Sequence, residues 1–138
     1  MKQKTAIILG ATGLTGSILL NKLISDSRYR KIKVFSRNHV QQKDEKIEEY
    51  LIELFELEKV ADLFTADEVY CCIGTTQSKT PDKDTYRMID FGIPATAAKL
   101  STRNKIETFQ VISAMGADEK SRIFYNRVKG EMEGAVLD

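Results

Sequence analysis

The chain has no long hydrophobic run and almost no net charge. Its 138 residues carry 21 basic and 20 acidic side chains, for a formal charge of +1. The two signs are evenly mixed, so the sequence has no basic stripe of the kind that binds nucleic acid. No apolar run approaches the roughly 18 residues that span a membrane, and the run at residues 5–9 is too short for a signal peptide. We therefore expect neither nucleic acid nor a membrane as a partner.

Cysteine and histidine are also scarce. The only two cysteines, Cys71 and Cys72, are adjacent. Neighbouring residues of a strand point to opposite faces, so the two thiols cannot readily pair with each other. Buried free thiols are typical of a reducing compartment, and we expect a cytoplasmic location. The single histidine, His39, lies in a polar segment and has no predicted role.

The hydrophobic pattern predicts one α/β domain over residues 1–138. With 42% apolar residues, the chain is long enough to bury a core. Short apolar runs alternate with helical patterns, and this order favours a parallel sheet with right-handed crossovers. We expect a Rossmann-like doubly wound sheet of about five strands, with helices on both faces. The predicted strands are residues 5–9, 31–36, 50–54, 68–74 and 108–113.

The third strand is the least clear of the five. Residues 48–64 are rich in Glu and Leu, and local propensity favours a helix throughout. The alternation of strands and helices instead predicts a strand at residues 50–54 and a helix that begins at Glu56.

Three glycines separate the first strand from the first helix. Gly10, Gly13 and Gly16 follow the pattern G-x-x-G-x-x-G. In this context glycines allow a tight turn and a close approach of backbone N–H groups to a pyrophosphate, which the positive end of the helix also attracts. The loop therefore predicts a dinucleotide site, and the alternative is a purely structural turn.

The end of the second strand indicates which dinucleotide is bound. An Asp or Glu at this place would hold the ribose 2′-hydroxyl of NAD, but the sequence has Ser36, Arg37 and Asn38 there. A hydroxyl and a guanidinium suit a 2′-phosphate, so we expect NADP(H) in preference to NAD(H). The alternative reading of Arg37 is a solvated loop residue.

A Tyr-x-x-x-Lys pair lies near the end of the chain, at Tyr125 and Lys129. Residues four apart on a helix are neighbours, and the surrounding segment has a helical pattern. The other such pair, Tyr29 and Lys33, lies where a helix should give way to a strand. The alternative is that Tyr125 is a core aromatic residue and Lys129 a solvated one.

Five segments together resemble a known family: GATGLTG, FSRN, CCIGTT, VISAMGAD and FYNRVKGEME, in this order. The chain is similar to the atypical short-chain dehydrogenases/reductases, and more narrowly to the NAD(P)-binding group that includes the Tat-interacting oxidoreductase-like proteins. The resemblance implies a catalytic set of Ser113, Tyr125 and Lys129. It also implies cofactor contacts from Gly10, Thr12, Gly13, Leu14, Thr15 and Gly16 (pyrophosphate), Ser36 and Arg37 (2′-phosphate), Glu53 (adenine), Cys72, Ile73, Gly74 and Thr75 (ribose and nicotinamide), and Lys129 (nicotinamide ribose).

The chemistry of carbonyl reduction needs these residue types. Tyr125 would give a proton to the new alkoxide, and the Lys129 ammonium one turn away would favour the phenolate. The Ser113 hydroxyl would orient the carbonyl oxygen and stabilise its developing charge. The substrate would be a small carbonyl compound or alcohol.

The sequence departs from the family pattern in two ways. Many members of the superfamily have an asparagine on the helix after the fourth strand, where this chain has Asp90. The resembled proteins also continue beyond the last segment, so we expect the C-terminal substrate region to be missing. Without a sixth strand, residues 108–113 would form a sheet edge, which predicts a homodimer paired along it.

Three functions remain open from the sequence. The first is an NADP-dependent oxidoreductase, with this chain forming its cofactor-binding part. The second is a non-catalytic NADPH-binding protein that senses redox state and regulates a partner. The third is an incomplete product of a longer protein.

Overall fold

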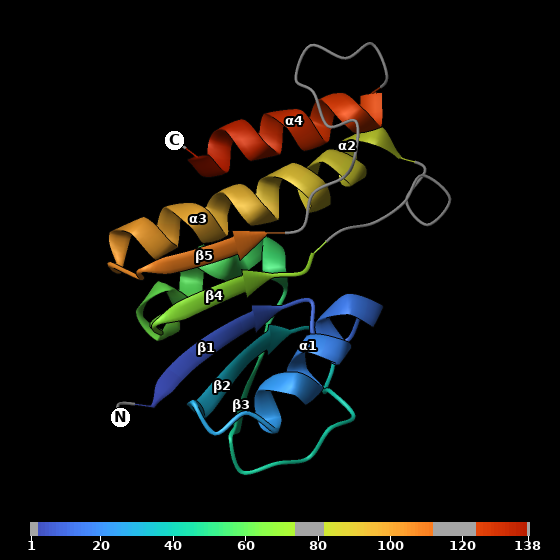
Figure 1. Cartoon of the computed structure of the whole chain (residues 1–138). Helices are drawn as coiled ribbons and strands as arrows, with labels where there is room; N and C mark the ends of the chain where they lie inside the picture. Colours follow the sequence, from blue (N-terminus) through green and yellow to red (C-terminus); the bar gives the residue numbers. More distant parts are fainter. Residues whose placement is uncertain (1–2, 74–81, 112–123, 138) are drawn as a thin grey trace.

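A five-stranded parallel sheet forms the centre of the computed structural model, which describes residues 3–73, 82–111 and 124–137 (Figure 1). The strand order is β3-β2-β1-β4-β5, as predicted for a doubly wound sheet. The strands are β1 (Lys4–Leu9), β2 (Tyr29–Ser36), β3 (Ile47–Leu51), β4 (Glu68–Cys71) and β5 (Thr108–Val111).

The central strand explains why the sequence begins with a continuous apolar run. β1 pairs with β2 on one side and with β4 on the other, and Thr5 to Leu9 are all buried. A parallel strand that is covered on both faces has no side for polar residues. Leu9 lies opposite Phe35 of β2 and Cys71 of β4, so these three strands end together at one edge of the sheet.

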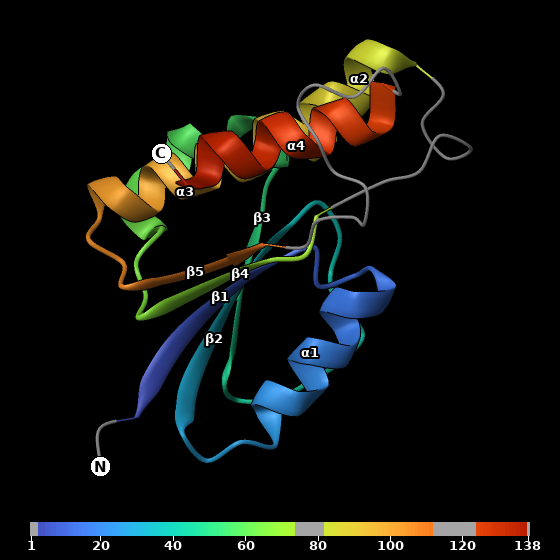
Figure 2. The same cartoon turned by 45° about the horizontal axis from the view of Figure 1, so that its top comes forward.

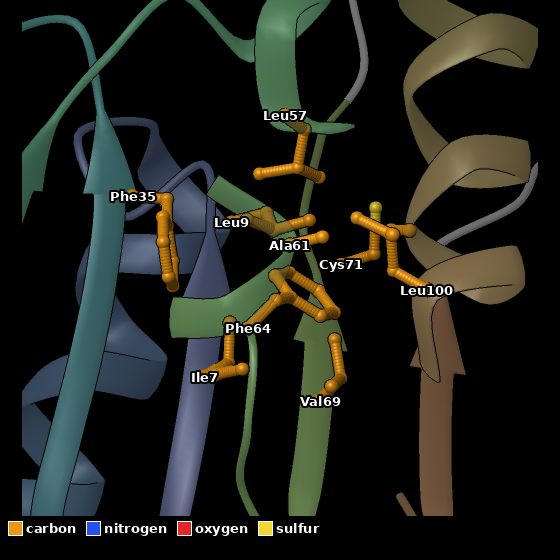
Figure 3. Close-up of a cluster of buried hydrophobic side chains, with 10 residues drawn as sticks. Ile7, Leu9, Phe35, Leu57, Ala61, Phe64, Val69, Cys71 and Leu100 are labelled. Atoms are coloured by element: carbon orange, nitrogen blue, oxygen red, sulfur yellow. The ribbon is translucent and has the colours of Figure 1, made fainter. Parts of the chain in front are cut away.

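Helices cover both faces of the sheet (Figure 2). The helix α1 (Leu14–Ile24) lies on one face. The other face carries η1 (Leu54–Leu63) and α3 (Ile93–Arg103), and α4 (Phe124–Leu137) packs beside α3. Alternate residues of β1 therefore enter different cores: Ala6 and Ile8 face α1, whereas Ile7 and Leu9 face η1 and α3. Figure 3 shows the second core, in which Phe64, the residue after η1, and Leu100 of α3 lie over the sheet.

One long helical segment follows β4 and contains a wider turn. α2 (Lys83–Arg87), the π-helical turn η2 (Met88–Gly92) and α3 follow one another without a break. Asp82 caps the beginning, because its carboxylate accepts a hydrogen bond from the Thr85 amide at 2.8 Å. The turn η2 contains Asp90, whose side chain is completely buried. Within the described residues, no helix is both long enough and apolar enough to cross a membrane.

The third strand does not lie where the sequence predicted it. β3 covers residues 47–51 instead of 50–54, because pairing with β2 sets its limits: Ile47 lies opposite Ile32, and Leu51 lies opposite Ser36, where β2 ends. The segment after it also differs. η1 begins at Leu54 and consists of 3₁₀ turns with kinks at Glu56 and Val60, instead of the α-helix that was expected from Glu56.

Candidate functional site

The ends of β1 and β4 meet at the centre of the carboxyl edge of the sheet. The Cys72 amide donates a hydrogen bond to the Leu9 carbonyl at 2.8 Å, which extends the pairing beyond β4. Gly10 then turns the chain with a φ of +85°, and a Cβ at this position would lie 2.7 Å from the Cys72 carbonyl oxygen. Strand order reverses between β1 and β4, and doubly wound sheets bind their ligands at such a point.

Gly16 lets α1 approach this turn. A Cβ at Gly16 would lie only 2.0 Å from the Gly10 carbonyl oxygen, so no other residue fits without movement of the backbone. Gly10 and Gly16 are therefore required by the fold itself. Their presence alone does not indicate a ligand.

Gly13 is different, because neither conformation nor packing requires a glycine there. It is the N-cap of α1 with a φ of −80°, and the nearest atom to an added Cβ would be 3.4 Å away, an ordinary contact. Among the described residues no side chain caps α1, so there its first N–H groups lack the usual side-chain acceptor. Thr12, Leu14 and Thr15 are exposed around this helix end. The arrangement leaves room and donors for an anion.

Arg37 extends from the end of β2 into solvent. It makes no hydrogen bond or ion pair with any other residue that the structure describes. The neighbouring Ser36 is buried, and its hydroxyl donates to the Asn38 carbonyl at 2.6 Å. Of these two residues, Arg37 is thus the one whose donors remain available for a ligand.

Glu49 of β3 holds the loop that carries Arg37. Its carboxylate accepts a hydrogen bond from the Val40 amide at 2.8 Å and lies 2.6 Å from His39 Nδ1. The hydrogen bond from His39 and that from Val40 lower the pKa of Glu49, so the carboxylate stays ionised. No role was predicted for His39 from the sequence, because nothing in the local pattern indicates a partner on another strand.

The remaining predicted cofactor contacts lie at the same edge or outside the described residues. Glu53 is exposed and is the N-cap of η1. Cys72 and Ile73 are partly buried after β4, next to Gly10. Burial raises the pKa of Cys72, and it raises that of Cys71 to about 12, so both thiols stay protonated. Gly74 and Thr75 lie outside the described residues.

A hollow of about 300 Å³ opens beside this edge on the α1 face of the sheet. Thr15 and Ile18 of α1 line one side, and Cys72 and Gln110 line the other. The hollow therefore adjoins both the glycine turn and the end of β4.

The predicted catalytic residues are described only in part. Ser113 lies outside the described residues. Tyr125 and Lys129 both belong to α4, as the spacing predicted, but the position of the Tyr125 side chain is also outside the description. Lys129 is only 8% exposed, and its Nζ lies 3.5 Å from Oδ2 of Asp90. It is therefore not the solvated lysine of the alternative reading.

Relatives were found by comparison of the sequence with curated proteins, whereas no family model matches the chain. The protein HTATIP2 of Rattus norvegicus is 29% identical over 140 residues, which cover 99% of this chain and 57% of the relative. The mitochondrial protein FMP52-1 of Scheffersomyces stipitis is 30% identical, over 96% of this chain and 60% of its own length. The chain thus spans less than two thirds of the length of these relatives.

Solved structures share the fold at low sequence identity. UDP-glucose 4-epimerase of Thermotoga maritima, solved with UDP-glucose, has a TM-score of 0.79 at 15% identity, over 96% of this chain and 50% of that one. The enzyme WbmG of Bordetella bronchiseptica, solved with NAD, has a TM-score of 0.79 at 12% identity, over 99% of this chain and 50% of that one.

The comparisons correct the expected location. The cytoplasmic assignment rested on the two cysteines being buried free thiols, but the FMP52 relatives from Scheffersomyces stipitis, Debaryomyces hansenii and Candida glabrata are named as mitochondrial proteins. The assignment was wrong, because free cysteines indicate a reducing environment and do not distinguish one compartment from another.

The two helix-proximal glycines should respond differently to substitution. Gly16→Ala should lower the free energy of unfolding by about 3 kcal/mol or more, because the new methyl group would overlap a backbone carbonyl. Gly13→Ala should change it by no more than about 1 kcal/mol, the effect of a poorer N-cap residue. Urea unfolding followed by circular dichroism measures both values. Equal losses of unfolding free energy in the two variants would contradict the conclusion that packing requires a glycine at position 16 but not at position 13.

Sequence similarity covers nearly the whole chain, and the sheet has the strand order and the glycine turn that the motifs predicted. The solved structures agree with this fold over the same residues. The predicted resemblance to the atypical short-chain dehydrogenases/reductases, and to the Tat-interacting oxidoreductase-like group among them, is therefore confirmed.

Proposed function

We propose that this chain binds a nicotinamide dinucleotide across the carboxyl edge of the sheet, with the pyrophosphate at the N-terminus of α1. The main observation behind this proposal is the glycine at position 13. The fold does not require a glycine there, whereas a side chain at this exposed helix end would take the space of an approaching phosphate. That WbmG was solved with NAD on the same fold supports the choice of ligand class.

The preferred dinucleotide in this proposal is NADP(H). Arg37 stands at the end of β2 without a partner among the described residues, and its guanidinium can pair with a 2′-phosphate in fork geometry. The carboxylate of Glu49 in β3, which holds this loop, is engaged by His39 and Val40. It is therefore not offered to a ribose hydroxyl.

The reaction in this proposal is the reduction of a small carbonyl compound, or the oxidation of the matching alcohol. The bound nicotinamide would supply or accept the hydride. Tyr125 would give the proton to the substrate oxygen, Lys129 would favour the phenolate, and Ser113 would orient that oxygen. The buried position of Lys129 supports this, because a lysine withdrawn from solvent can act on a neighbour with little screening.

The first test compares the two reduced cofactors. The unaltered chain should bind NADPH more tightly than NADH, and Arg37→Ala should weaken NADPH binding by about 1.5–3 kcal/mol with little effect on NADH. The chain has no tryptophan, so the fluorescence of the bound cofactor reports affinity without interference.

Gly13→Ala separates the pyrophosphate site from the 2′-phosphate site. It should weaken NADPH and NADH binding alike, because both share the pyrophosphate. Equal affinity of the unaltered chain for the two cofactors would contradict the NADP preference. Binding of neither would contradict the proposal as a whole.

The catalytic assignment is tested by turnover. Tyr125→Phe should lower the rate of NADPH-dependent carbonyl reduction by about 100-fold or more, because the substitution removes only the proton donor. NADPH affinity should stay the same. The assay follows NADPH absorbance with small aldehydes, ketones and keto sugars. Tight NADPH binding without any reduction would contradict turnover by this chain, and would fit either a non-catalytic redox-sensing protein or a chain that forms only the cofactor-binding part of its enzyme.

The proposed assembly is a homodimer formed along β5. This strand is an edge of the described sheet, and the Thr108 amide donates to the Asp67 carbonyl beside β4 at 3.4 Å. Amides alternate in direction along a strand, so those of Phe109 and Val111 face away from β4. Neither amide has a backbone acceptor among the described residues, so both could pair with a second copy.

Val111→Pro should therefore convert a dimer into a monomer, since it removes an outward amide while keeping an apolar side chain. Val111→Ala is the matched control, because it shortens the side chain but keeps the amide, and it should stay dimeric. Sedimentation velocity at micromolar concentration distinguishes the states. A monomeric unaltered chain would show that this edge does not pair.

A further inference from the structure

Asp90 and Lys129 form a buried ion pair between two helical segments. Asp90 in η2 has no solvent exposure, Lys129 in α4 has 8%, and Oδ2 and Nζ are 3.5 Å apart. Removing two charges from water is costly, and an apolar pair of similar volume would often stabilise a fold as well or better. Stabilisation of the fold therefore does not explain why two charged residues, instead of two apolar ones, occupy these positions.

The backbone directs Asp90 toward Lys129 through an unusual turn. η2 is a π-helical turn inside an otherwise continuous helix, and such turns occur frequently at functional sites. η2 and α4 pack against each other, so the wide turn and the lysine face a common interior. Two features therefore involve the lysine of the Tyr-x-x-x-Lys pair. The π-helical turn packs against the helix that carries this lysine, and Asp90 of the turn forms an ion pair with it.

We propose that Asp90 is a positioning residue for Lys129, and that it fixes the ammonium so that its other N–H donors can reach the nicotinamide ribose. An ammonium has three donors, and its contact with Asp90 Oδ2 is an ion pair at 3.5 Å that leaves donors for a ligand. The inference rests on the proposed function, because it takes from it the contact between Lys129 and the ribose. Asp90 itself touches neither cofactor nor substrate.

The proposal separates the two halves of the cofactor. The nicotinamide ribose is common to NADPH and NADH, so loss of Asp90 weakens both to the same extent. Arg37 acts on the 2′-phosphate and therefore affects NADPH alone. Adenosine 2′,5′-bisphosphate contains only the adenosine half, so it serves as a probe that does not contact Lys129.

The experiment measures affinities for NADPH, NADH and adenosine 2′,5′-bisphosphate in Asp90→Asn, Lys129→Met and the double variant. Asp90→Asn should weaken NADPH and NADH binding by about tenfold, the effect of one hydrogen bond of a charged group. It should leave the bisphosphate affinity unchanged. The double variant should bind like Lys129→Met, because Asp90 acts only through that lysine.

Glu131→Gln is the matched control. Glu131 of α4 pairs with Arg87 of α2 at 2.7 Å, so this variant breaks a second ion pair between the same two helical segments without touching Lys129. It should leave all three affinities unchanged. Were it to reproduce the effect of Asp90→Asn, the pair would only hold the helices together and the proposal would be overturned.

Other results also decide the question. Unchanged NADPH affinity in Asp90→Asn, an equal loss for the bisphosphate, or a double variant weaker than Lys129→Met would each refute the positioning role. If Asp90→Asn alone does not fold, the double variant can still be compared with Lys129→Met, because it removes both charges of the pair. That comparison also tests the positioning role. An unaltered chain that binds none of the three ligands would instead refute the proposed function.

Discussion

The structure depends on one close contact, where the turn after β1 lies between α1 and the end of β4. A Cβ at Gly10 would meet the Cys72 carbonyl, and a Cβ at Gly16 would meet the Gly10 carbonyl. These two glycines bring a helix N-terminus, whose N–H groups no described side chain caps, to the point where the strand order reverses. Because packing already accounts for both, the third glycine of the motif, Gly13, is the informative one.

Much of the fold could be predicted from the sequence, because its main signals are local. The apolar run at residues 5–9 needs cover on both faces, and a strand with a neighbour on each side provides it. β3 was misplaced because its limits are not local: Ile47 and Leu51 are defined by the residues of β2 that they pair with. Its Glu-rich sequence favours a helix, and pairing with β2 overrides that preference.

The candidate site also has features that a local sequence pattern indicates and features that depend on contacts between distant elements. The glycine turn, Arg37 and the Tyr-x-x-x-Lys spacing are short patterns, and the sequence indicated all three. Contacts between elements were missed, namely Glu49 with His39 and Asp90 with Lys129. Asp90 was recognised as a departure from the family pattern, but its partner could be found only once η2 and α4 were seen to pack together.

The two halves of the proposed site belong to different layers of the molecule. The glycine turn and Arg37 depend on β1, β2 and α1, whereas Lys129 is held by the helices on the opposite face. In the proposed function, a dinucleotide would extend from one layer to the other across the carboxyl edge of the sheet. Its adenosine half would then depend on strand packing, and its nicotinamide half on the docking of α4 against η2. Weak docking of α4 would therefore impair the reactive end of the cofactor while leaving the binding of its adenosine end intact.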